Sequence, residues 1–247
     1  EEAAEAYNRA GNFYKLANDF LKAGASYKRA AENFSQAGDC KTEVVNATVE
    51  SATCYKKGGD IVRAIKLFEK AIEHYNDNGR LGMSARYQKE IAEMYEADNN
   101  HPLAIEKYKQ AAQLFNHDNK HSNANQCLQK AATFLSESGN GAQMTEAAEI
   151  FEGIARESLT SRLGAFSAKG YFFQALIILI ALGDPIKVNN KIEQYSGEDH
   201  TFATSRECEF ISKLAKAVEE YNIEDYESAC ANFDRITPLD PWKIRLL

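Results

Sequence analysis

The sequence offers one spacing that suits a metal ion. His117 and His121 stand four residues apart, with Asp118 between them. On a helix, this spacing places two imidazoles on one face, where they can bind zinc. The residues around them are asparagines and a lysine, which are typical of an exposed turn. We therefore expect no metal site here.

Catalytic motifs are missing from the sequence. It contains no GxxxxGK[ST] phosphate loop and no GxGxxG, HExxH or GxSxG motif. Acidic pairs such as Glu1-Glu2 and Glu219-Glu220 are typical of solvated faces or helix ends. No pair has the convergent partner that a glycosidase needs. We expect a protein that is not an enzyme, needs no cofactor and has no ATPase activity of its own.

Lysines recur at one place in the pattern. Lys15 and Lys56 each follow an aromatic residue directly, and they stand 41 residues apart. If the chain is a repeat, equivalent positions stack along one edge of it. Five more residues could extend this line: Lys57, Arg80, Arg86, Lys130 and Lys169. The alternative is scattered solubilising charge, and the pattern alone favours that alternative.

Aromatic residues define the internal repeat. Four of them follow a small residue by four positions and precede a small or aliphatic residue by three, which marks one face of a helix. They recur at steps of 41, 40 and 43, as Tyr27, Phe68, Tyr108 and Phe151. A second aromatic stands upstream of each: Tyr14, Tyr55, Tyr95 and Phe134. Turn signals such as Gly58-Gly59-Asp60 separate the two, so the unit is helix, turn, helix.

These repeats predict an all-α chain. We expect a TPR-like, right-handed stack of antiparallel helix pairs over residues 1–157, a twisted helical sheet with the four repeat aromatics buried. The step of about 40 exceeds the roughly 34 residues of ordinary TPRs, so the helices should be longer. Beyond residue 157 the repeat fades, and residues 158–247 should form a C-terminal helical bundle packed on the stack. Its expected helices cover 167–182, begin at Asp184-Pro185, and cover 202–221 and 223–235.

Composition narrows the class of protein. The net charge of -7 argues against nucleic-acid binding, which needs a basic surface. The five cysteines are odd in number, widely spaced and without a CxxC pair: Cys40, Cys54, Cys127, Cys208 and Cys230. This favours free thiols in a reducing compartment. The longest apolar run, 175–182, is too short to cross a bilayer.

Several strings along the chain are distinctive when taken together. The most specific are SAKGYFF at 167–173, SREC at 205–208 and LDPW at 239–242. Weaker ones include YKK at 55–57, NGR at 78–80 and AIEKY at 104–108. In these strings, which occur in order along essentially the whole chain, the sequence resembles the alpha/beta-type soluble NSF attachment proteins, or SNAPs.

The resemblance implies an adaptor in vesicle trafficking and membrane fusion, including ER–Golgi transport. Members coat the SNARE four-helix bundle, which contains syntaxin-type SNAREs, and recruit the hexameric ATPase NSF. Such a protein is cytoplasmic and associates peripherally with membranes through an N-terminal loop. That loop and the C-terminal tail that stimulates NSF match no part of these 247 residues. This chain should therefore bind SNAREs better than it activates NSF.

The resemblance also implies a binding face. The family's basic concave face is matched by Lys56, Lys57, Arg80, Lys130 and Lys169, and Arg86 replaces a lysine with its charge kept. This overturns the interpretation as scattered charge, and Lys15 joins the same set. Two positions depart from the pattern, because Asn18 and Gln126 stand where members have lysine. Binding could then rely on neighbours such as Lys22 and Lys120.

Two other functions are known for helical-repeat chains, a peptide-binding scaffold and a glycosidase. A generic TPR-type peptide-binding scaffold, such as a clamp for chaperone tails, needs a groove built at 34-residue spacing, which steps of 40 to 43 do not provide. A helical-toroid glycosidase needs two carboxylates about 5–10 Å apart in one pocket. Binding of an acidic C-terminal peptide, compared with binding of a SNARE bundle, separates the first of these from an adaptor.

Overall fold

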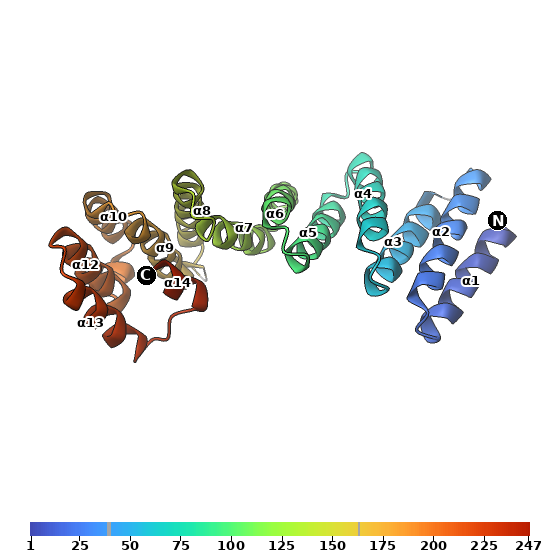
Figure 1. Ribbon diagram of the computed structural model, residues 1–247. Helices are drawn as coiled ribbons and strands as arrows, with labels where there is room; N and C mark the ends of the chain where they lie inside the picture. The colour runs from blue at the N-terminus through green and yellow to red at the C-terminus, as the bar shows by residue number, and fades with distance from the viewer. Residues whose placement is uncertain (39–40, 163) are drawn as a thin grey trace. The chain divides into compact units, whose positions relative to one another are not determined.

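The computed structural model describes residues 1–38, 41–162 and 164–247, and in these ranges it holds fourteen helices and no strand (Figure 1). The predicted all-α fold of stacked helix pairs is confirmed. The chain divides into two compact units, Glu1–Cys127 and Leu128–Leu247, with the division inside α7 (His121–Ser136). The boundary at residues 157 and 158, expected from the fading repeat, stays a prediction.

The first unit is built from helices of nearly equal length. They are α1 (Glu2–Leu16), α2 (Phe20–Ala37), α3 (Lys41–Lys57), α4 (Ile61–Asp77), α5 (Leu81–Ala97), α6 (His101–His117) and the first part of α7. The four from α3 to α6 have 17 residues each. From α1 to α6 each helix packs on the next one along the chain, and Figure 1 shows them running back and forth. Two such helices and two three-residue turns account for the step of 40.

The four turns between α3 and α7 share one backbone conformation. The middle residue of each is left-handed, with φ of 82° at Gly59, 66° at Gly79 and 56° at both Asn99 and Asn119. Glycine and asparagine tolerate this conformation better than other residues. The following N–H then closes the helix end, as Asp60 does by donating to the carbonyl of Tyr55 at 2.9 Å.

In the turns that precede α2, α4 and α6, the side chain of the last turn residue also caps the next helix. Asp19, Asp60 and Asn100 accept a hydrogen bond from the third backbone N–H of α2, α4 and α6, respectively. Such caps satisfy one of the free N–H groups at a helix start. The same short sequence therefore stops one helix and starts its antiparallel partner.

The repeat aromatics form the core, as predicted. Tyr27, Phe68, Tyr108 and Phe151 are 3%, 2%, 1% and 0% exposed. In the first unit, Phe68 stacks on Tyr87 with ring centres 5.4 Å apart. Small residues make room for such rings, since a Cβ added to Gly11 would lie 2.8 Å from the ring of Tyr27.

The upstream aromatics behave less uniformly than the sequence suggested. Tyr55 is buried against Gly24 of α2, whose added Cβ would lie 3.1 Å from its ring. Tyr14, at the same register on α1, is 37% exposed. Tyr55 owes its burial to α2, the helix that precedes its own.

The second unit contains the rest of α7 and then α8 (Gly141–Leu159), α9 (Ala165–Ala181), α10 (Pro185–Glu198), α11 (His200–Ala203), α12 (Arg206–Glu219), α13 (Ile223–Asp234) and α14 (Pro241–Leu246). The apolar helix expected over 167–182 is α9, whose residues from Ala175 to Ile180 are all buried. Asp184 caps α10 through the N–H of Lys187, and Pro185 opens the helix, as expected.

One expected helix of this unit was wrong. Residues 202–221 form two helices, because Ser205 adopts an extended conformation with φ of -84° and ψ of 157°. Its hydroxyl accepts a hydrogen bond from the N–H of Cys208 at 3.1 Å and starts α12. Serine favours this capping position over a helix interior. The segment from Thr237 to Trp242, expected only to break the pattern, leads into α14, where Trp242 stacks on Phe151 with centres 6.0 Å apart.

Candidate functional site

Alternate helices of the first unit are joined by ion pairs. Lys15 of α1 lies 2.7 Å from Glu50 of α3, and Lys56 of α3 lies 2.5 Å from Glu90 of α5. These contacts place α1, α3 and α5 side by side in one layer. We call the outer side of this layer, marked by these four residues and Arg86, the odd-helix face.

Three of the expected basic residues of the first unit lie on this face. Lys15 and Lys56 occupy equivalent places near the ends of α1 and α3, as their spacing predicted. Arg86 is exposed and stands one helical turn before Glu90, so the two point to the same side of α5. The odd-helix face therefore carries both signs of charge.

Lys57 and Arg80 lie at helix ends, beside the residues that mark the odd-helix face. Lys57 ends α3, and its ammonium group lies 5.7 Å from the ring centre of Phe20 on α2. Arg80 is the residue before α5, and its guanidinium lies 5.7 Å from the ring centre of Tyr75 on α4. Both side chains combine an exposed charge with an aromatic contact that restrains it.

Lys130 and Lys169 belong to the second unit. Lys130 is an exposed residue of α7, and Lys169 is a half-buried residue of α9. In the repeat register Lys130 stands 40 residues after Glu90, so it occupies the glutamate position. Glu96 stands 40 residues after Lys56 and occupies the lysine position. The line that begins with Lys15 and Lys56 thus changes sign in the next repeat.

Glu50 and Glu90 are the site residues that sequence reasoning missed. Each stands 34 or 35 residues after its lysine, and the two glutamates are 40 residues apart, so the repeat step was the available signal. The hydrogen bond to Glu50 raises the pKa of Lys15, although partial burial opposes the shift. The lysine side chains remain 36% and 34% exposed, so both pairs can be reached from solvent.

Of the two positions that depart from the family pattern, Asn18 has a structural explanation and Gln126 has none. Asn18 is the left-handed residue of the turn between α1 and α2, with φ of 58°, a conformation that asparagine tolerates better than lysine. Gln126 is exposed on α7. The neighbours expected to compensate already have partners, because Lys22 pairs with Asp19 at 2.9 Å and Lys120 with Asp118 at 2.7 Å.

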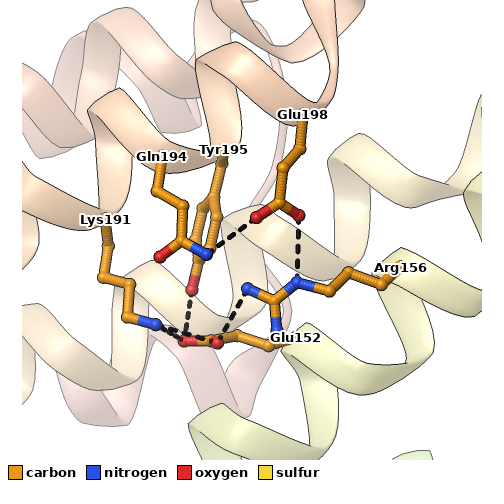
Figure 2. A network of polar contacts seen from close by, with 6 residues as sticks. All are labelled: Glu152, Arg156, Lys191, Gln194, Tyr195 and Glu198. Atoms are coloured by element: carbon orange, nitrogen blue, oxygen red, sulfur yellow. Dashed lines mark hydrogen bonds and ion pairs between the residues drawn. The ribbon is translucent and has the colours of Figure 1, made fainter.

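A second cluster of charged residues lies in the other unit (Figure 2). Lys191 and Tyr195 of α10 point at Glu152 of α8, with 2.8 Å from the Lys191 ammonium and 2.5 Å from the Tyr195 hydroxyl to its carboxylate. Arg156 contacts Glu152 at 3.2 Å and Glu198 at 2.9 Å. The oxygens of Glu152 are therefore fully occupied by donors of the protein itself.

We call this cluster of Glu152, Arg156, Lys191, Tyr195 and Glu198 the clamp, because its charges pair with one another across two helices. Burial opposes ionisation of Glu152, but the hydrogen bonds from Lys191 and Tyr195 outweigh it and lower the pKa of the carboxyl below 4.5. Burial and the bond to Glu152 raise the pKa of Tyr195. An ionised, 6% exposed glutamate cannot serve as a general acid, so the cluster holds α8 to α10.

The other groups considered for chemistry are unremarkable in the part of the chain that the structure describes. His117 ends α6 and His121 begins α7, and among the described residues no three His, Cys, Asp or Glu side chains converge on a possible metal position. Cys54, Cys127, Cys208 and Cys230 are free thiols, and burial raises the pKa of Cys127 to about 11. Cys40 lies outside the described residues. No described helix is both long and apolar enough to span a membrane.

Comparison with known proteins gives a match over the whole chain. Residues 1–247 match the family model described as "Soluble NSF attachment protein, SNAP". An alpha-soluble NSF attachment protein of Vitis vinifera is 35% identical over 247 residues, which cover all of this chain and 84% of that protein. A beta-soluble NSF attachment protein of Bos taurus is also 35% identical, over 248 residues covering all of this chain and 81% of that protein.

Two further comparisons are with a vesicular-fusion protein and with a solved structure. The vesicular-fusion protein SEC17 of Komagataella phaffii is 35% identical over 250 residues, covering all of this chain and 82% of that protein. A solved structure of kinesin light chain TPR-like repeats from Podosopora anserina is 15% identical, with a TM-score of 0.48, over 89% of this chain and 96% of that one. The fold assignment rests on the helices of this chain itself.

Proposed function

Because this chain belongs to the soluble NSF attachment protein family, we propose that it is an adaptor that binds assembled SNARE complexes and recruits the NSF ATPase for their disassembly. The observation that carries the proposal is the family match over all 247 residues at 35% identity to named attachment and vesicular-fusion proteins. An adaptor needs surfaces and no catalytic centre, which agrees with a stack of helix pairs whose polar clusters are internally paired.

For the SNARE-binding surface we propose the odd-helix face together with Lys57, Arg80, Lys130 and Lys169. Three features support the first-unit part of this surface. Lys15, Lys56 and Arg86 share the odd-helix face, Lys57 and Arg80 present exposed cations at the ends of its helices, and all five are outside the core. An acidic helical bundle, such as one containing syntaxin-type SNAREs, is the partner that such cations attract.

The experiment is a double charge reversal, Lys56→Glu with Lys57→Glu. One exposed ion pair contributes only about 0.2–1 kcal/mol, but each reversal also replaces attraction with repulsion. We expect at least a roughly tenfold loss of affinity for an assembled SNARE bundle at low salt, which corresponds to about 1.4 kcal/mol. Wild-type binding should also weaken as salt rises, because surface charges are screened.

A matched control changes the net charge equally on another helix. Lys66→Glu with Lys70→Glu alters two exposed lysines of α4, which is not part of the odd-helix face. This control should bind the bundle like wild type, and circular dichroism should show that both variants are folded. Equal binding by wild type and the Lys56/Lys57 variant would contradict the proposed face. Preference for an acidic C-terminal peptide over the bundle would favour a generic TPR-type scaffold instead.

Recruitment of NSF is a separate part of the proposal. It is tested by adding NSF to the bundle with and without this chain and following ATP hydrolysis and bundle disassembly. We expect NSF to associate with the bundle only when this chain is present.

A further inference from the structure

Two of the lysines assigned to SNARE binding already have a carboxylate partner within the chain. Glu50 lies 2.7 Å from Lys15, and Glu90 lies 2.5 Å from Lys56. The glutamate side chains are 45% and 31% exposed, so they face solvent beside the lysines rather than beneath them. A partner that reaches either ammonium group must also meet the adjacent carboxylate.

The two pairs have the same construction. In each, a lysine near the end of one odd helix reaches the glutamate in the middle of the next odd helix, across 35 residues in one case and 34 in the other. The glutamates are one repeat step apart, at positions 50 and 90. A chance surface ion pair would not recur at the same register in consecutive repeats.

We propose that Glu50 and Glu90 are built-in counter-charges that weaken the attraction of the odd-helix face for an acidic partner. This inference rests on the proposed function. A Lys–Glu pair is neutral as a unit, so its field falls off faster than that of a single lysine. A carboxylate arriving at Lys56 is attracted by the ammonium and repelled by Glu90 at nearly the same distance. The face then favours partners with many spaced contacts over a single dense anion.

The charge balance of the face agrees with this role. Lys15 and Lys56 are offset by Glu50 and Glu90, so the unbalanced cations among the residues named for this surface in the first unit are Arg86, Lys57 and Arg80. Neutralising the glutamates would add two uncompensated positive charges at equivalent places on α1 and α3. Because the pairs are partly exposed, their removal should cost the fold little.

The test is the variant Glu50→Gln with Glu90→Gln, which keeps side-chain size and removes the two negative charges. We expect it to bind an assembled SNARE bundle about three- to tenfold more tightly than wild type at low salt, with a steeper loss as salt rises. The matched control is Glu32→Gln with Glu73→Gln, two exposed glutamates of α2 and α4. It makes the same change in net charge away from the odd-helix face and should bind like wild type.

Each outcome decides the proposal. Equal or weaker binding by the Glu50/Glu90 variant overturns it, and weaker binding would mean that the glutamates hold the lysines in their binding positions. An equal gain in the control also overturns it, because net charge alone would then explain the effect. The single variants Glu50→Gln and Glu90→Gln each give part of the gain and replace the double variant if circular dichroism shows it unfolded. Loss of binding in the Lys56/Lys57 reversal with no gain here would overturn this inference and leave the proposed function standing.

Discussion

Replacing Glu152 should destabilise the second unit in a way that depends on pH. Glu152 is 6% exposed and accepts from Lys191 and from Tyr195, whose own side chain is fully buried. Breaking a fully buried ion pair costs about 3–5 kcal/mol. Lys191 and Arg156 are 24% and 41% exposed and can turn to water, so we expect about 2–4 kcal/mol for Glu152→Ala. Glu152→Gln keeps an acceptor for the tyrosine and should cost about 1–2 kcal/mol.

The sign of the pH dependence follows from the lowered pKa of Glu152. A carboxyl whose pKa is lower in the folded protein stabilises it above the unfolded-state value of 4.5, and this contribution is lost as pH falls through the folded-state pKa. The glutamine variant lacks that contribution at every pH. The stability difference between wild type and Glu152→Gln should therefore be largest near neutral pH and shrink below about pH 4.5.

Urea unfolding followed by fluorescence is the assay. The chain has one tryptophan, Trp242, which stacks on Phe151 beside the clamp, so its emission reports on this unit. The control is Glu149→Gln, an exposed glutamate on the same helix, which makes the same charge change. Equal stability of the two glutamine variants at neutral pH would refute the clamp. A difference between wild type and Glu152→Gln that does not shrink in acid would refute the assignment of the ionised state.

Three further predictions concern the core, a helix cap and the glycines. Phe68→Ala, at a 2% exposed ring stacked on Tyr87, should cost about 3–5 kcal/mol by urea unfolding, and Phe68→Leu should cost much less. A loss under about 1 kcal/mol for Phe68→Ala would contradict the repeat core. Asp60→Ala removes the cap of α4 and should cost about 1 kcal/mol in the same assay, and an unchanged midpoint would show that water replaces the cap. Gly11→Ala should destabilise because its Cβ meets the ring of Tyr27, whereas Gly153→Ala meets nothing within 4 Å in α8 and should stabilise by about 0.5–1 kcal/mol; the reverse order in thermal melts would refute this packing.

The repeat could be predicted from the sequence because its signals are local. An aromatic with small residues four before and three after marks one helical face, and the burial of Phe68 and Tyr108 follows from that spacing alone. The apolar run from Ala175 and the capping pair Asp184-Pro185 are equally local.

Features that depend on the meeting of distant helices could not be predicted. The 40-residue spacing of Glu50 and Glu90 marks them as equivalent positions of the repeat. They are nevertheless two of 36 acidic residues, and nothing near either of them in sequence points to a lysine 35 or 34 positions earlier. Glu152 likewise meets Lys191 and Tyr195 only because α10 packs against α8. The break at Ser205 was missed for another reason, since a serine inside an apolar pattern fits both a helix interior and a cap.

The turns with a left-handed middle residue allow whole repeats of the first unit to be removed or added. The turns at 58–60 and 98–100 both have a left-handed middle residue and end in a capping residue, so removing a whole period, such as residues 61–100, joins one turn end to an equivalent one. Removing fewer residues would instead rotate every later helix by about 100° per residue and turn its apolar face outward. The length of this scaffold can therefore change in steps of one period, and a lineage or a designer could lengthen or shorten its reach without redesigning its core.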